Sequence, residues 1–372
     1  MKNSVFNSKS AIPAVLSLIL MGGETPVETN YPVETNPNAI HILLDFTGNV
    51  QVKKTQWKQF HPADSGITLN SNDQIKLGSN ASVTIYCSNL DQLTVTQPGT
   101  YLVYQGCPGG EEIIRLCPEC NNDTRRPLGT KEERLQQLPY LISPRNTLVF
   151  NESLTLRWNG VSGASQYTVK VGDWERQTNE TQIVYDGELN PGEFYEITVV
   201  ADNGVSSQDE DSDGQYSWFI VLEEEEAKTL QEQVAVIKQQ ELSQDQEGLI
   251  LAYFYRGNEL NAEAIQVLEG LVKSVSKTTT VYQLLGDIYR QVGLSLMAKE
   301  VYGQGLALTK EEENSEVKAM MQRGLAEVEY TLGNRDEAAE LLEKAKASYS
   351  ALGDEIQVEA LAKQINKVLE RD

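Results

Sequence analysis

Four cysteines, all between positions 87 and 120, are the residues of this 372-residue chain whose chemistry is easiest to specify. Cys117 and Cys120 form a Cys-x-x-Cys pair, which can supply two ligands to a tetrahedral zinc ion, but no second such pair accompanies it. Cysteines of an exported chain form disulfides instead, and four cysteines allow three connectivities. We therefore predict disulfides among Cys87, Cys107, Cys117 and Cys120, with a four-thiolate zinc site as the alternative.

A second polar group is the acidic run in which Asp209, Asp211 and Asp213 alternate before Gly214. Alternating carboxylates followed by glycine are typical of calcium loops. Ile220, however, stands where the helix-loop-helix type needs a bidentate glutamate. We predict a solvated acidic turn here. The alternative is a calcium site formed by the three aspartates.

Catalytic chemistry has few candidate residues in this sequence. His41 and His61 are the two histidines, and neither has a carboxylate or cysteine at a spacing suited to acid-base or nucleophilic work. The glycines fall singly at turns, so no phosphate-binding loop is indicated. We expect no enzymatic activity and no cofactor.

The elements that must position the remaining polar side chains are helices that recur along the C-terminal part. Each copy has a small residue preceded by leucine, and an alanine follows twelve residues later; the pairs are Ala252 and Ala264, Gly286 and Ala298, and Ala326 and Ala338. The copies are spaced by 34 and then 40 residues. Such a unit cannot bury its apolar face alone, so the pattern predicts stacked helix hairpins.

This pattern resembles the tetratricopeptide repeat (TPR). The middle copy is the fullest match, with Tyr282, Leu285-Gly286, Tyr289, Gly293 and Ala298 at the family's positions. The third copy departs from the family at Glu329, where an aromatic residue is usual. The spacing of apolar residues from 354 to 369 predicts a capping helix.

The resemblance implies a concave groove that binds a protein or peptide partner, formed by the first helix of each hairpin. The family's groove positions carry over to Tyr253, Arg256, Gln283, Asp287, Arg290, Arg323, Glu327 and Tyr330. Arginines can bind a carboxylate through two hydrogen bonds, so a carboxylate-bearing partner is expected. The alternative is that these side chains form an ordinary solvated helix face.

Net charge is −23, which disfavours nucleic acid and anionic membrane surfaces as partners. Residues 1–23 combine Lys2 and Lys9 with an apolar stretch from Ala11 to Met21, a pattern typical of a signal peptide. An uncleaved anchor is the alternative, and membrane contact is expected through it alone. Residues 24–39, with Pro-Val-Glu-Thr-Asn at 26–30 and 32–36, are predicted to be a flexible linker.

Residues 40–120 alternate in hydrophobicity, which predicts β-strands. The string Gly48-x-Val50-x-Val52, Gly66-x-x-Leu69, Asp73-x-Ile75 and Val83-x-Ile85 resembles a FecR-type domain, in which the leucine, aspartate and isoleucine mark a turn. That resemblance implies a sensing or interaction module outside the cytoplasm.

After a predicted linker at 121–139, residues 140–222 contain five alternating runs, which predict an antiparallel sandwich. Trp158 and the string Leu189-x-Pro191-Gly192-x-x-Tyr195-x-Ile197 resemble a fibronectin type III domain. In that family Tyr195 would return its hydroxyl to the backbone at a strand corner.

The predicted fold is multidomain, β followed by α, with two small β domains before an α-solenoid at 223–372. The predicted function is that of a bacterial, exported, non-catalytic adaptor in the periplasm or cell envelope. The alternatives are an envelope sensor that acts through the FecR-like domain, and a structural or adhesive surface protein.

Overall fold

The computed structural model describes residues 39–107, 113–116, 132–210, 217–309 and 315–370. The predicted signal peptide, most of the first linker, and Cys117, Cys120, Asp211 and Asp213 lie outside these residues. Within the described residues, no helix is long and apolar enough to span a membrane.

The N-terminal β region, residues 39–107 and 113–116, is called the β-module below. Its eight strands form two antiparallel four-stranded sheets, in the orders β4-β1-β6-β7 and β3-β2-β5-β8. The strands are β1 (His41–Thr47), β2 (Val50–Lys53), β3 (His61–Pro62), β4 (Thr68–Leu69), β5 (Gln74–Leu77), β6 (Ser82–Tyr86), β7 (Gln92–Val95) and β8 (Gly99–Leu102).

Burial in β1 differs from the alternation that the sequence predicts. Its first four residues, His41 to Leu44, are all buried, instead of every second one. The reason is that the β-module packs its second face on the helices, so both faces of this strand are covered. The alternation in β5 and β6 matches the prediction, with Ile75, Val83 and Ile85 buried.

The second β domain is a sandwich of a five-stranded and a three-stranded sheet, in the orders β10-β16-β15-β12-β13 and β14-β11-β9. Its strands are β9 (Leu141–Ser143), β10 (Thr147–Val149), β11 (Leu154–Trp158), β12 (Tyr167–Val171), β13 (Trp174–Thr178), β14 (Gln182–Tyr185), β15 (Phe194–Ala201) and β16 (Ser217–Val221). All pairings are antiparallel except that of β10 with β16.

The predicted tyrosine corner is confirmed, because the Tyr195 hydroxyl accepts a hydrogen bond from the Asn190 amide at 2.8 Å. The five alternating runs are strands as predicted. Strands β9, β10 and β13 were missed by the sequence analysis, β13 because its residues Trp174 to Thr178 are half-buried or exposed and show no period-two burial.

The C-terminal part is a helical array of tetratricopeptide-like hairpins. The pairs α3/α4, α5/α6 and α7/α8 follow the solitary helix α2, and α9 is the predicted capping helix. Their bounds are α2 (Glu224–Lys238), α3 (Gln244–Gly257), α4 (Asn261–Lys273), α5 (Thr279–Gln291), α6 (Ser295–Leu308), α7 (Glu316–Thr331), α8 (Arg335–Leu352) and α9 (Glu355–Leu369). The repeat alanines Ala252, Ala264, Ala298, Ala326 and Ala338 are all buried where helices cross.

Part of the predicted linker 121–139 is helical and packed against the fold. Residues 132–135 form the short helix α1 (Glu132–Leu135), and Leu135 and Leu138 are buried. Lys299 of the array pairs with Glu132 at 3.2 Å. Two buried leucines and an ion pair fix this stretch, whereas its charged composition alone suggested a solvated connection.

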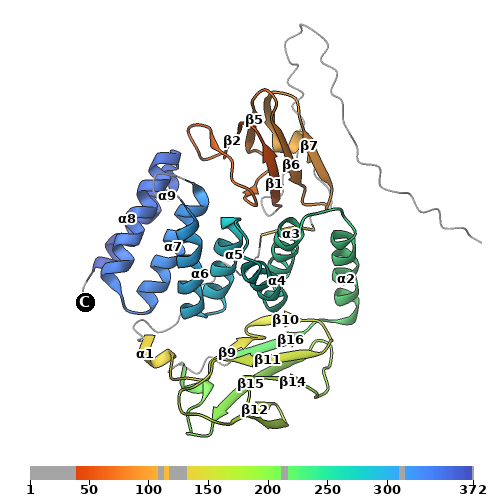
Figure 1. The fold of residues 1–372 in the computed structure, drawn as a ribbon, viewed down its shortest axis with the longest axis vertical. Coiled ribbons are helices and arrows are strands. Elements are labelled where there is room, and N and C mark those ends of the chain that lie inside the picture. The colour runs from red at the N-terminus through yellow and green to blue at the C-terminus, as the bar shows by residue number, and fades with distance from the viewer. Residues whose placement is uncertain (1–38, 108–112, 117–131, 211–216, 310–314, 371–372) are drawn as a thin grey trace, which may run out of the picture.

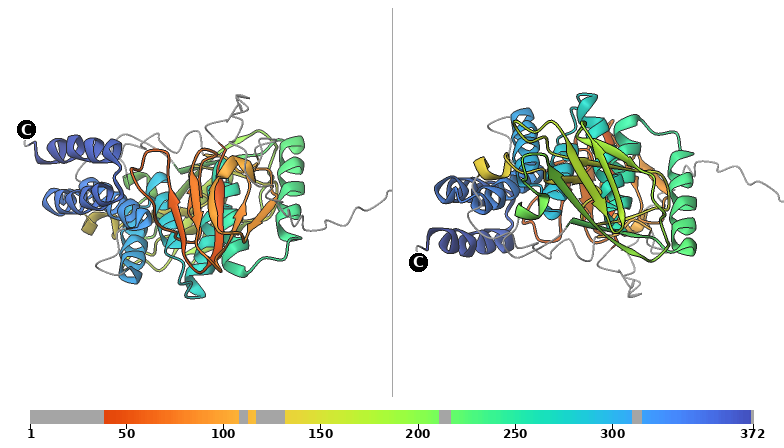
Figure 2. Two further views of the ribbon diagram at one scale, coloured as in Figure 1. Left: turned by 90° about the horizontal axis from the view of Figure 1, so that it is seen from above. Right: turned by 90° about the horizontal axis from the view of Figure 1, so that it is seen from below.

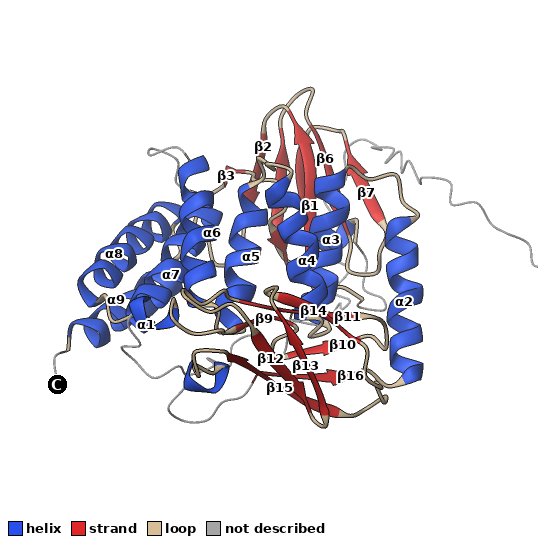
Figure 3. Cartoon of the chain, turned by 60° about the horizontal axis from the view of Figure 1, so that its bottom comes forward, coloured by secondary structure: helices blue, strands red, loops and turns tan. Residues whose placement is uncertain are grey.

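The array is the middle layer of the molecule. Figure 1 shows it between the β-module above and the sandwich below, and Figure 3 shows the same layering from a tilted view. Seen from above in Figure 2, the β-module covers the first hairpins, while α8 and α9 extend beyond it. One hydrophobic core runs from the β-module through the array to Tyr140, Phe150 and Leu222 of the sandwich, which also has a core of its own.

Candidate functional site

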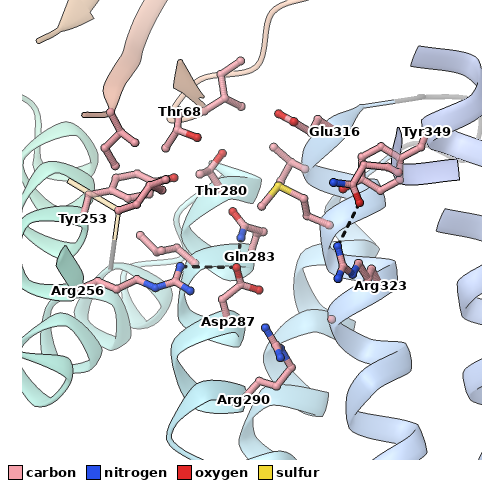
Figure 4. A pocket seen from close by; sticks show the side chains of 18 of the residues that line it. Thr68, Tyr253, Arg256, Thr280, Gln283, Asp287, Arg290, Glu316, Arg323 and Tyr349 are labelled. Atoms are coloured by element: carbon pink, nitrogen blue, oxygen red, sulfur yellow. Dashed lines mark hydrogen bonds and ion pairs between the residues drawn. The ribbon is translucent and has the colours of Figure 1, made fainter. Parts of the chain in front are cut away.

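A cavity of about 400 Å³ lies where the first helices of the hairpins, α3, α5 and α7, face the β-module. Figure 4 shows polar side chains from all three helices converging on this space, with Thr68 contributed by the β-module. Residues of the predicted groove therefore line this space, but the β-module covers part of it, so the site is a partly open cavity between the two parts. The sequence suggested an open concave surface instead.

Seven of the eight predicted groove residues line this cavity: Tyr253, Arg256, Gln283, Asp287, Arg290, Arg323 and Glu327. The eighth, Tyr330, does not line it. The Arg335 guanidinium lies 5.8 Å from the Tyr330 ring, near the end of α7. The assignment of Tyr330 to a partner-binding groove stays a prediction.

The β-module is fixed to the array by hydrogen bonds to backbone groups of one loop. Tyr253 donates its hydroxyl to the Gly66 carbonyl at 3.1 Å, and Thr280 donates to the Ser65 carbonyl at 2.8 Å. Burial raises the pKa of Tyr253, so its hydroxyl stays protonated and remains a donor. A side chain on Gly66 would collide with Leu249 and Thr280, so close contact here requires glycine.

Ion pairs connect the same two parts. Lys54 and Glu316 pair at 2.5 Å, and their side chains are 8% and 11% exposed. The exposed pair between Lys58 and Glu355 at 2.7 Å contributes little, since water screens it. Removing one partner of the buried pair would leave an uncompensated charge, so the Lys54 pair is the stronger tie.

Asp73 holds the loop that faces the array. This carboxylate is fully buried, and it accepts hydrogen bonds from the Thr55 and Asn70 amides, each at 2.9 Å. Its role at a turn, expected from the sequence, is confirmed by these contacts. The loop from Lys54 to Ile67 thus presents a fixed surface to the helices.

Inside the cavity most charges are already matched. Asp287 accepts hydrogen bonds from Gln283 and Tyr302, both at 2.6 Å. Arg290 pairs with Glu327 at 2.9 Å, and Arg323 reaches the same carboxylate at 3.1 Å. Burial alone lowers the pKa of Arg290, but Glu327, Tyr302 and Asp287 together outweigh it and raise that pKa above its usual value.

Arg256 is the cation whose donors are least used. Its closest ion pair among the described residues, with Asp287, is long at 3.7 Å. Its Nε is buried and has no hydrogen-bond partner among them. A guanidinium has five N–H donors, so Arg256 can donate hydrogen bonds to a further oxygen acceptor.

The structure describes two of the four cysteines. Cys87 and Cys107 form a buried disulfide, as the sequence predicts for an exported chain. His41 lies beside them, close enough that the three side chains could hold a metal ion if the sulfurs were reduced. Because both sulfurs are bonded to each other, the zinc alternative is wrong for this pair.

Both histidines make structural contacts. The Ser88 amide donates to Nδ1 of His41 at 3.2 Å, and burial lowers the pKa of His41 to about 4, although Asp73 opposes this. Nε2 of His61 lies 3.1 Å from the Leu352 carbonyl, at the contact between β-module and array. Each imidazole is thus tied to backbone groups of the fold.

The one described member of the candidate calcium site makes local contacts. Asp209 accepts a hydrogen bond from the Ser206 amide at 2.8 Å, and its neighbour Glu210 pairs with the buried Arg145 at 2.9 Å. These bonds fit a capped turn. Asp211 and Asp213 lie outside the described residues, so the calcium alternative stays a prediction.

Comparison with known proteins yields structural likeness alone. No family model matches the chain. No curated protein matches it either. Among solved structures, BtubC from P. vanneervenii is 19% identical, covers 39% of this chain and 72% of that one, and has a TM-score of 0.28.

Two structures of TPR-like repeats attributed to a kinesin light chain of Podosopora anserina are 21% identical and each cover 39% of this chain. The matched regions span 85% and 86% of the two solved chains, with TM-scores of 0.28 and 0.27. Values this low transfer neither fold nor function. The tetratricopeptide-like character of the array therefore rests on its own hairpins and their small-residue crossings.

Sequence reasoning missed the cavity residues that lie outside the family's groove positions, among them Thr68, Thr280, Tyr349 and Gln357. Gln357 of α9 accepts a hydrogen bond from Arg323 at 3.2 Å. The missing signal is long-range: the β-module and the capping helix enter this site from opposite ends of the chain.

Proposed function

We propose that this protein is an exported, non-catalytic scaffold that binds a carboxylate-bearing segment of a partner protein in the cavity between array and β-module. TPR-like arrays bind proteins, and the site that this array builds is polar and rich in arginine. The observation that supports the partner's chemistry is Arg256, whose guanidinium lines the cavity with one long ion pair. A carboxylate would supply the acceptors that Asp287 does not.

Size limits what can enter. A cavity of about 400 Å³ falls at the lower end of the range for ligand pockets, about 300 to 1,000 Å³. It suits one or two side chains or a chain end, and an extended peptide along the whole concave face would collide with the β-module. The partner segment is thus short and acidic.

Export is supported by the N-terminal pattern of residues 1–23 and by the Cys87–Cys107 disulfide. The absence of catalysis is proposed because both histidines are tied to backbone groups, and neither lines the cavity.

The test is binding of labelled pentapeptide pools to the full chain, measured by fluorescence anisotropy. One pool carries glutamate at its centre and a free terminal carboxylate, and the control pool carries glutamine and a terminal amide. We expect the acidic pool to bind about tenfold more tightly, because hydrogen bonds to charged groups each contribute about 1.5–3 kcal/mol.

The site assignment is tested with Arg256→Gln, which should remove that preference. Arg176→Gln is the matched control, since Arg176 lies on the sandwich in a half-exposed pair with Asp186. Equal binding of both pools, or an unchanged preference in Arg256→Gln, would refute the proposal. Thermal unfolding of each variant shows whether it is folded.

A further inference from the structure

A second cavity, of about 750 Å³, lies between the array and the sandwich and is called the array–sandwich cavity below. Its walls come from helices α2 and α4 of the array and from strand β11 and the loop before it in the sandwich. We propose that this cavity binds a short free peptide of about four residues, with the peptide's ammonium end at Glu263 and its carboxylate end at Lys273. The site is separate from the one proposed above and does not depend on it.

The α4 wall is a single stripe of side chains. Glu263, Gln266, Gly270 and Lys273 lie three or four positions apart, so they share one face of the helix, and all of them line the cavity. From Glu263 to Lys273 the helix rises by about 15 Å. An extended chain rises by about 3.3 Å per residue, so about four residues span most of this length.

One end of the stripe is acidic. Glu263 lines the cavity together with Glu152 of the sandwich, and Oε2 of Glu263 is buried with no hydrogen-bond partner among the described residues. Burial raises the pKa of Glu263 to about 7, and the charge of Glu152 adds to this effect, although backbone hydrogen bonds at Glu263 and Phe150 oppose it. An ammonium group in the cavity would supply the cation that this carboxylate lacks.

The other end of the stripe is basic. Arg157 of β11 binds Glu269 of α4 through two hydrogen bonds of 2.8 Å, and Tyr289 donates to the same carboxylate at 2.6 Å. Glu269 is therefore already matched, so Lys273, one turn further along α4, adds positive charge to this end. Lys238 of α2 is a second exposed lysine that lines the cavity. A terminal carboxylate can accept hydrogen bonds from such ammonium groups.

The two charged ends disfavour ligands with a single charge. A lone cation bound at Glu263 would leave Lys273 unmatched, and a lone anion bound at Lys273 would leave Glu263 without a counter-ion. A short peptide with free termini carries opposite charges at its two ends, so it complements both. Between them the exposed Gln266 offers a donor and an acceptor to the peptide backbone.

Gly270 leaves room for the ligand in the middle of the stripe. A β-carbon at this position would meet no atom within 4 Å. A larger side chain here would fill part of the cavity without changing any charge. Gly303 of α6 is the matched control, because it is also an exposed helical glycine with open space around it, and it does not line the cavity.

The experiment is isothermal titration calorimetry of the full chain with tetra-alanine. The measurement is made near pH 7.5, between the pKa of about 7 of Glu263 and that of the peptide amine, about 8. We expect the peptide with free termini to bind, and acetylation of its amine to weaken binding about tenfold, because the charged partner of Glu263 is lost. Amidation of its carboxylate should weaken binding less, about threefold, since both lysines are exposed.

Di-alanine should bind about tenfold more weakly than tetra-alanine, because two extended residues span about 7 Å and cannot reach both ends. Equal binding of the free and acetylated tetrapeptides would overturn the proposal. So would the absence of binding at millimolar concentration.

Variants locate the site. Glu263→Gln should abolish the preference for the free amine, and Gly270→Leu should prevent tetra-alanine from binding, whereas Gly303→Leu should bind as the wild type does. Equal losses in Gly270→Leu and Gly303→Leu would overturn the proposal. Loss of binding in Arg256→Gln but not in Glu263→Gln would assign the peptide to the first cavity and would overturn it as well. Thermal unfolding shows whether each variant is folded.

Discussion

Glu263 lies where the array meets the sandwich and makes the stability of the fold depend on pH. It lies on α4 beside the sandwich, and one of its carboxylate oxygens is buried without a hydrogen-bond partner among the described residues. Burial raises its pKa from 4.5 to about 7, although a hydrogen bond from the Phe150 backbone opposes this. In the unfolded chain the same carboxyl ionises near its usual pKa.

The pKa of Glu263 is higher in the folded chain than in the unfolded chain, so ionisation of this group destabilises the fold. Below pH 4.5 both states are protonated and Glu263 costs nothing. Between pH 4.5 and 7 the unfolded state releases its proton first, so stability falls as pH rises, by on the order of 3 kcal/mol in total. Above pH 7 the loss from this group is complete.

Glu263→Gln should therefore be more stable than the wild type at pH 8 and lose this part of the pH dependence. Urea unfolding at pH 5 and pH 8 measures both effects. Glu359→Gln, at an exposed position on α9, is the control and should behave as the wild type. An equal loss of stability between the two pH values in Glu263→Gln and wild type would contradict this account.

At the scale of single elements, the hairpins depend on small residues at their crossings. A β-carbon on Gly286 of α5 would lie 2.5 Å from Cε1 of Tyr302 on α6. Tyr302 is fully buried, and it donates to Asp287 at 2.6 Å, so its ring cannot move aside without breaking that bond. Tyr302 thus takes part both in the packing of the hairpin and in the polar network of the cavity.

Gly286→Ala should destabilise the chain by about 1–3 kcal/mol, as overpacking does, and should also disturb Asp287. Gly303→Ala is the matched control on α6, because a β-carbon there meets open space. That change should be neutral or stabilising by up to about 1 kcal/mol, since alanine is the better helix former. Thermal unfolding compares the two, and equal effects would contradict the close crossing.

The elements also show which parts of the structure the sequence could predict. Repeat spacing predicted the three hairpins and the capping helix, because helical periodicity and small-residue places are local patterns. Seven of the cavity residues were implied by the resemblance to the tetratricopeptide repeat. Strand β13 could not be found this way, since its exposed polar residues carry no alternation. The four buried residues at the start of β1 reflect contact with helices far along the chain, which no local pattern encodes.

At the scale of the whole molecule, the sequence suggested separate domains, and the structure joins them. Lys54 meets Glu316 across 262 positions, so this pairing could not be deduced from composition or spacing. The sandwich contributes Tyr140, Phe150 and Leu222 to the core of the array. Polar contacts add to this attachment: Arg157 binds Glu269 through two hydrogen bonds of 2.8 Å, and Arg145 donates to the Val292 carbonyl at 2.7 Å.

Both attachments include apolar contacts. The β-module shares a continuous hydrophobic core with the array, so separating them would expose apolar surface. The sandwich has a core of its own, and its Tyr140, Phe150 and Leu222 also belong to the core of the array. The cavity is therefore a permanent site between two parts of one folding unit, and the isolated array would lack one of its walls.

Hydrogen exchange in increasing urea, resolved by peptide fragments, tests this claim most directly. Amides of residues 41–102 and 244–369 should lose protection at the same urea concentration, because the two parts unfold together. Lys54→Met should lower both midpoints equally, whereas Lys58→Met, at an exposed pair, should leave them unchanged. If the β-module instead loses protection first while the hairpins stay protected, the shared folding unit, and with it the permanent cavity between the two parts, is refuted.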